Sequence, residues 1–194
     1  MKKTVELLEL DEMIVKKALH PISIQKRNVQ EIPHDQQKTS VSQVSKMAER
    51  LLSLALQKKE YFDYVVALMD LEYIPNDYAT LYKLLVSYYT IHKSVTHVHE
   101  VSGFLRQEHQ ELEHRYLTLL TRGEEELVLL ANEERVYQEL KALITRLQRS
   151  FLETRKKEFS SLIRQTEAAG DSKNLHALLE QFQTISDRLA QLDA

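Results

Sequence analysis

Apolar residues recur every three or four positions along most of this chain, a spacing typical of amphipathic α-helices. The pattern is longest in the last third, where it predicts one helix from Glu133 to about Ala169 and a second helix after Gly170. The first helix has its apolar stripe at Leu140, Leu143, Ile144, Leu147, Phe151, Leu152, Phe159, Leu162 and Ile163. The second has its stripe at Leu175, Leu178, Leu179, Phe182, Ile185, Leu189 and Leu192.

The ends of these two helices have recognisable signals. Asn132 is a suitable N-cap, and the glutamates that follow it suit the positive end of the helix dipole. Gly170 is expected to end the first helix, because glycine adopts the left-handed conformation without steric cost. Asp171 or Ser172 then caps the second helix. So short a turn forces the helices to run antiparallel, so residues 132–194 are predicted to form a helical hairpin.

The middle of the chain, residues 47–131, is predicted to be a bundle of five or six short helices. Pro75 separates two of them, and Gly123 is expected to end the fifth, leaving Glu124–Leu130 as a last short turn or helix. The successive stripes begin with Val44, Met47, Ala48, Leu51, Leu52 and Ala55, and continue with Tyr61, Tyr64, Val65, Leu68, Leu81, Leu84, Leu85, Tyr88, Val98, Val101, Phe104, Leu105, Leu112, Tyr116, Leu119 and Leu120.

Residues 1–46 are predicted to be a separate N-terminal region. An amphipathic helix is expected over residues 4–19, halted by Pro21. The stretch from His20 to Ser45 is polar, contains Pro21 and Pro33, and shows no sustained period, so it is interpreted as a linker.

Composition agrees with an all-α fold: a small helical bundle followed by a long antiparallel hairpin. The 194 residues include only three Gly and three Pro, whereas helix-forming residues are abundant. The chain has no Cys, which excludes disulfides, thiolate metal ligands and thiol nucleophiles, and is compatible with a cytoplasmic location. No apolar run approaches the roughly 20 residues that span a bilayer, and the N-terminus is too acidic for a signal peptide.

The distribution of charge argues against nucleic-acid binding. Residues 47–132 carry eight Lys and Arg against thirteen Asp and Glu, and residues 133–194 carry ten of each. A nucleic-acid-binding protein normally presents a basic face. Arg155, Lys156 and Lys157 are consecutive, so a helix spreads them around its axis, and they are interpreted as a solvated face. No direct contact with nucleic acid is expected.

No catalytic, cofactor-binding or metal-binding motif is present. The strongest candidates for zinc ligands are His92, His97, His99, His109 and His114 with Glu100 and Glu113. However, His97 and His99 point to different sides of a helix, and no His-Glu-x-x-His motif occurs. These histidines are interpreted as structural. Seven tyrosines between Tyr61 and Tyr89 have the right chemistry to stack on nucleobases, yet they lie at helical spacing beside leucines, so core and boundary packing is predicted.

The last helix is the best candidate for a binding site. Its stripe extends nearly to the end of the chain, and a two-helix hairpin cannot bury all of its apolar surface. The residues predicted to bind a partner protein are Leu175, Leu178, Phe182, Ile185, Leu189 and Leu192.

These features resemble a known family. The segment TEAAGDSKNLHALLEQFQTISDRLAQLDA is similar to the carboxy terminus of bacterial DNA primase, which commonly has a helix, a Gly-Asp turn and a final leucine-rich helix. The segments AERLLSLALQKKEYFDYV, NDYATLYKLLVSYYT and FLRQEHQELEHRYLTLL resemble the helical bundle that precedes that tail. Together, residues 48–194 resemble the primase's helicase-binding domain.

The resemblance implies a non-catalytic role in the primosome during DNA replication. In that family, the domain docks on the amino-terminal domains of the hexameric replicative helicase, recruits primase to the fork and modulates the helicase. The zinc-binding cysteines and the polymerase core of primase have no counterpart here. The resemblance therefore implies a fragment in which residues 1–46 would be the end of the catalytic domain plus the linker, and a separately encoded protein of this design is the alternative.

Two other interpretations stay open. The amino-terminal domain of the replicative helicase resembles the same bundle, but no P-loop follows here, and the glycine usual after its central helix is replaced by His92, Lys93 and Ser94. An unrelated helical adaptor or scaffold protein would need only the hairpin.

Overall fold

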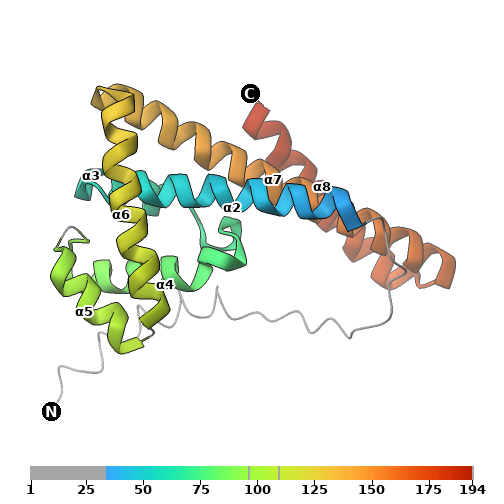
Figure 1. Ribbon diagram of the computed structural model, residues 1–194. Helices are drawn as coiled ribbons and strands as arrows, with labels where there is room; N and C mark the ends of the chain where they lie inside the picture. Colours follow the sequence, from blue (N-terminus) through green and yellow to red (C-terminus); the bar gives the residue numbers. More distant parts are fainter. Residues whose placement is uncertain (1–33, 96, 109, 194) are drawn as a thin grey trace, which may run out of the picture. The chain divides into compact units, whose positions relative to one another are not determined.

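The computed structural model describes residues 34–95, 97–108 and 110–193, and all regular structure in these residues is helical. Its elements are α2 (His34–Ala55), α3 (Lys59–Leu68), the short 3-10 helix η1 (Leu71–Tyr73), α4 (Asn76–His92), α5 (Val98–Glu108), α6 (Gln110–Leu130), α7 (Glu133–Ala169) and α8 (Ser172–Asp193). The predicted all-α fold, a bundle followed by a long antiparallel hairpin, is confirmed (Figure 1). The helix predicted over residues 4–19 lies outside the described residues.

The N-terminal linker was predicted to extend too far along the chain. Residues 34–45 are the first turns of α2 rather than linker. The later turns of α2 pack Ala48, Leu51 and Leu52 in the core, and this packing offsets the cost of nucleating a helix. Once nucleated, the helix extends through polar residues that have no apolar pattern of their own but also contain no Gly or Pro.

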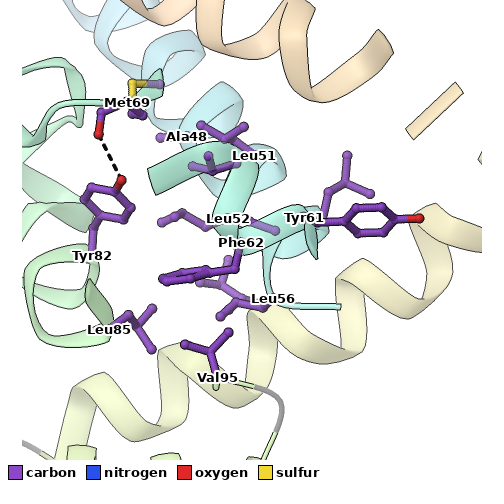
Figure 2. Close-up of a cluster of buried hydrophobic side chains, with 14 of the residues drawn as sticks. Ala48, Leu51, Leu52, Leu56, Tyr61, Phe62, Met69, Tyr82, Leu85 and Val95 are labelled. Atoms are coloured by element: carbon purple, nitrogen blue, oxygen red, sulfur yellow. Dashed lines mark hydrogen bonds between the residues drawn. The ribbon is translucent and has the colours of Figure 1, made fainter. Parts of the chain in front are cut away.

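The core is built around the second half of α2. Six apolar residues of this half and of the turn after it are fully buried, namely Ala48, Leu51, Leu52, Leu54, Ala55 and Leu56. Phe62 from α3 and Leu85 from α4 pack in the same cluster (Figure 2). The Tyr82 hydroxyl donates a hydrogen bond of 2.9 Å to the Met69 carbonyl oxygen, which satisfies the polar end of this otherwise apolar side chain.

Gly123 does not end a helix, contrary to the sequence prediction. α6 continues without interruption from Gln110 to Leu130, and Gly123 lies where it crosses α2. A Cβ atom on Gly123 would overlap the Ser53 carbonyl oxygen and the Gln57 side chain. The glycine is therefore required by the close approach of two helices.

α7 belongs to both parts of the molecule. Its first half buries Val136, Leu140, Leu143, Ile144 and Leu147 in the same cluster as the bundle residues. The predicted N-cap is confirmed, because the Asn132 side chain accepts a hydrogen bond of 2.9 Å from the backbone N–H of Arg135. The core thus runs across the boundary predicted between residues 131 and 132.

Candidate protein-interaction site on the C-terminal hairpin

The turn of the hairpin has the geometry that its sequence predicts. Gly170 has a φ of 70° in the left-handed region, and its N–H donates to the Glu167 carbonyl oxygen at 3.1 Å. The N–H of Asp171 reaches back to the Thr166 carbonyl oxygen at 3.3 Å. The Asp171 carboxylate then accepts a 3.2 Å hydrogen bond from the N–H of Asn174 and so caps α8. Figure 1 shows α8 returning along α7 from this turn.

α8 places the six predicted binding residues on one helical stripe, and all six are half-buried. They are Leu175, Leu178, Phe182, Ile185, Leu189 and Leu192. Because α8 packs mainly along α7, one neighbour cannot cover the stripe completely. Two further leucines of the hairpin are partly open to solvent: Leu162 of α7 is 39% exposed and Leu179 of α8 is 45% exposed. The hairpin therefore leaves a partly accessible apolar surface.

Basic side chains lie beside this apolar surface. The Lys156 ammonium group sits 5.3 Å from the centre of the Phe182 ring. The Arg155 guanidinium group lies 5.8 Å from the Phe151 ring and 6.0 Å from the Phe159 ring, and it pairs with Glu158 at 3.1 Å. A groove on α7 is lined by Glu153, Lys156, Lys157, Ser160, Ser161 and Arg164.

The sequence interpretation of these cations as a solvated face missed their contacts with aromatic rings. Arg155 and Lys156 are half-buried, because their side chains pack on phenylalanines while the charged ends stay accessible. The only available signal was the four-residue spacing of Phe151, Arg155 and Phe159 along one face of the helix.

The end of α8 also approaches the bundle. Arg188 lies 3.8 Å from Glu72 of η1, and Gln148 of α7 donates a 3.0 Å hydrogen bond to the Leu68 carbonyl oxygen. Phe151 packs edge-on against Tyr73, with ring centres 5.3 Å apart. Leu189 and Leu192 thus belong to a part of α8 that contacts the rest of the fold, which gives them a structural role beside the predicted binding role.

The tyrosines of the bundle pack as predicted. Tyr61, Tyr82 and Tyr88 are buried, and Tyr64, Tyr73, Tyr78 and Tyr89 are half-buried against the core. Tyr137 of α7 meets Tyr61 and Tyr64 edge-on, with ring centres 5.2 and 5.4 Å apart. These tyrosines are buried or packed against the core, which is the packing role expected from the sequence.

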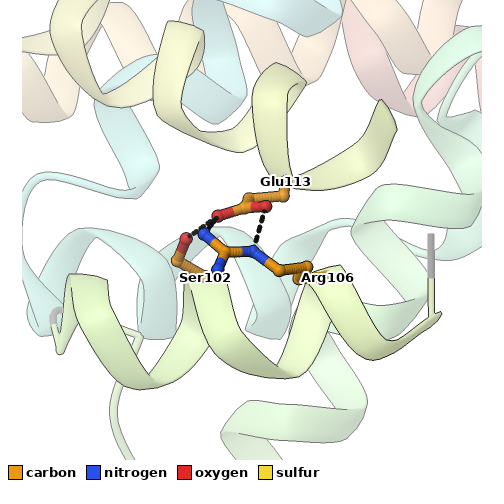
Figure 3. A network of polar contacts seen from close by, with 3 residues as sticks. All are labelled: Ser102, Arg106 and Glu113. Carbon is orange, nitrogen blue, oxygen red and sulfur yellow. Dashed lines mark hydrogen bonds and ion pairs between the residues drawn. The ribbon is translucent and has the colours of Figure 1, made fainter. Parts of the chain in front are cut away.

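The candidate zinc ligands that the structure describes are not brought together, and His109 lies outside the described residues. Glu113 is held by the Ser102 hydroxyl at 2.6 Å and by both the Nε and an Nη atom of Arg106 (Figure 3). The Arg106 guanidinium group, with the Ser102 hydroxyl, lowers the pKa of Glu113 to about 2. The His92 ring stacks on the Tyr88 ring, with ring centres 4.2 Å apart. In the part of the chain that the structure describes, no three His, Asp or Glu residues are grouped closely enough to hold a metal ion.

Comparisons with protein-family models, with curated proteins and with solved structures find no match to this chain. Within the described residues, no helix has the length and apolar character needed to cross a bilayer.

Proposed function

We propose that this chain is a helicase-binding domain of the bacterial primase type, which recruits primase to the replicative helicase and modulates that helicase by protein–protein contact. The observation that carries the proposal is the hairpin of α7 and α8, which presents a half-buried leucine and phenylalanine stripe while α7 begins in the core of a helical bundle. This is the arrangement that the sequence resemblance implies.

The chemistry of the hairpin suits a protein partner. Leu162 and Leu179 leave apolar surface for a partner to cover, at roughly 25 cal/mol per Å² buried. The groove beside this surface carries Lys156, Lys157 and Arg164 against Glu153. A matching surface on the helicase would place apolar residues opposite the stripe and carboxylates opposite the groove, since such complementarity fixes the register of two proteins.

We also propose that this role involves no catalysis. The stripe consists of leucine, isoleucine and phenylalanine, which supply no nucleophile, acid or base. We expect this chain to synthesise no primer alone, and we expect no appreciable binding to single-stranded DNA at physiological salt, because the bundle region is acidic.

The test is binding of the full chain to purified bacterial replicative helicase hexamers, measured by co-elution in size exclusion and by titration calorimetry. Leu189→Ala and Leu192→Ala are expected to weaken binding about thirtyfold each, since truncating an interface anchor costs about 2 kcal/mol. The matched control is Ile91→Ala, which removes an apolar side chain from an exposed position on α4 and should leave affinity unchanged.

Thermal melting separates binding from folding in the same variants. Weaker helicase binding with an unchanged melting temperature supports docking through the end of α8. A lowered melting temperature with unchanged binding would assign Leu189 and Leu192 to the structural contact near Glu72 instead. Absence of any complex at tens of micromolar would refute the proposed function.

A further inference from the structure

The outward face of α6 is an unusual surface for a helix that packs in a core. Leu117, Thr121, Glu124, Glu125, Val128 and Leu129 all lie on it, and all six are exposed. Their spacing of three to four residues places them along one side of the helix over about 18 Å. Val128 is 80% exposed and Leu129 is 76% exposed, more than the other large exposed apolar residues in the described chain. These six residues are called the α6 outer face below.

The opposite side of α6 is firmly fixed. Tyr116, Leu119 and Gly123 are buried, and Leu120, Leu127 and Leu130 pack against the core. The α6 outer face is thus presented by a rigid helix rather than by a loop. A partner that docks on it would pay little for ordering the backbone on this side.

The charge of the α6 outer face is negative and unneutralised. Glu124 and Glu125 have no ion-pair partner among the described residues, whereas the next residue, Glu126, pairs with Arg50 at 3.0 Å. Both arginines of α6 are engaged elsewhere: Arg115 lies over the Tyr78 ring at 5.3 Å, and Arg122 pairs with Glu49. The hydroxyl of Thr121 donates to the Leu117 carbonyl oxygen at 3.2 Å and offers no free donor.

We infer that the α6 outer face is a second docking surface, which takes a basic amphipathic helix of a partner protein. Apolar side chains of that helix pack on Leu117, Val128 and Leu129, and its lysines or arginines pair with Glu124 and Glu125. The α6 outer face is separate from the stripe of α8, and docking on it does not require helicase binding by the hairpin.

Charge selects this occupant over the others. Nucleic acid and anionic lipid surfaces are repelled by Glu124 and Glu125. A second copy of this chain, joined symmetrically through the same face, would bring four carboxylates together in an apolar contact. A helix rich in lysine or arginine instead replaces that repulsion with attraction, and the apolar residues supply the buried area.

The test uses two synthetic helical peptides of about 18 residues, one built from leucine and lysine and the other from leucine and glutamate in the same pattern. Each is added to the isotope-labelled full chain and followed by NMR chemical shifts, and affinity is measured by fluorescence anisotropy. The lysine peptide is expected to shift the signals of residues 117–129 selectively. The glutamate peptide is expected to leave them unchanged.

Variants then separate docking from general attraction between charges. The double variant Val128→Ser with Leu129→Ser is expected to lose at least tenfold in affinity for the lysine peptide with an unchanged melting temperature, because both side chains are exposed. Glu124→Gln with Glu125→Gln is expected to lose a similar factor. Ile91→Ser, at a position that is 74% exposed on α4, is the matched control and should bind within twofold of the wild type.

Three results would overturn the inference. Shifts confined to α7 and α8 would place the peptide on the hairpin. If the Val128→Ser, Leu129→Ser variant bound the lysine peptide as tightly as the wild type, the interaction would depend on charge alone. Concentration-dependent self-association of the wild type in sedimentation velocity, lost in that variant, would assign the face to contacts between copies of this chain.

Discussion

At Gly123, the absence of a side chain lets α6 cross closely over α2. The side-chain amide of Gln57 fills the space beside it and donates hydrogen bonds to the Ser53 carbonyl oxygen at 3.1 Å and the Leu120 carbonyl oxygen at 3.0 Å. One amide group thus joins the two helices at the point where a Cβ atom would not fit. The crossing depends on one small residue and one bridging residue.

Gly123→Ala is expected to lower the free energy of unfolding by about 2 kcal/mol or more, because the added methyl group overpacks the crossing and displaces Gln57. Gly103→Ala is the matched control. It also lies within a helix, but nothing would contact its Cβ within 4 Å, so it should gain up to about 1 kcal/mol from helix propensity. Urea unfolding of both variants measures the difference, and equal effects would contradict this account of the crossing.

Glu113 is expected to make the stability of the α5–α6 contact depend on pH. Its pKa falls from the ordinary 4.5 to about 2 in the folded chain because Arg106 and Ser102 hold the carboxylate. A depressed folded pKa contributes stability that is fully present above about 4.5 and is lost as pH falls toward 2. Glu113→Gln should therefore melt at a lower temperature than the wild type at pH 7, and the difference should shrink below pH 4.5.

The control for that measurement is Glu111→Gln, which changes an exposed glutamate two residues away on the same helix. Its melting temperature should follow that of the wild type across the whole pH range. A constant difference between Glu113→Gln and wild type from pH 7 to pH 3 would show that the amide acts through packing rather than through charge.

At the scale of elements, apolar periodicity was enough to predict most helices, because each one buries a single stripe. It was least reliable at helix ends. The start of α2 and the continuation of α6 through Gly123 depend on contacts between segments distant in sequence. Both Gly170 and Gly123 follow an apolar stripe, and both are predicted to end a helix. Gly170 does so, but Gly123 lies inside α6 where that helix crosses α2. The two cases differ only in the presence of a neighbouring helix, which the sequence pattern does not reveal.

The candidate site, too, could be predicted only in part from the sequence. The α8 stripe could be predicted because it is a repeat within one helix. The contacts of Lys156 with Phe182 and of Arg188 with Glu72 could not, because each joins side chains from two elements whose register is set by packing. The α6 outer face was missed because leucines and a valine in a short helical segment look alike whether they face the core or the solvent.

At the scale of the whole molecule, α8 is the part that can be removed most readily. The buried residues of α7 lie between Val136 and Leu152, and the half that pairs with α8 contributes little to the core cluster. Deleting residues 171–194 is expected to leave a chain that still unfolds cooperatively. Far-UV circular dichroism should lose more helix than the deleted residues account for, because the far end of α7 frays without its neighbour. Loss of the cooperative transition would place α8 in the same core.

The unbroken course of α7 makes it a lever. It runs for 37 residues without Gly or Pro, and its first half is clamped in the core. The part of α7 beyond Leu152, about 17 residues, extends roughly 25 Å from the packed region. A tilt of about 10° near Leu152 displaces the tip at Gly170 by roughly 4 Å. A small rearrangement of the Leu140, Leu143 and Leu147 side chains therefore produces a larger movement at the hairpin turn. Conversely, a force on the turn is transmitted along α7 to the bundle.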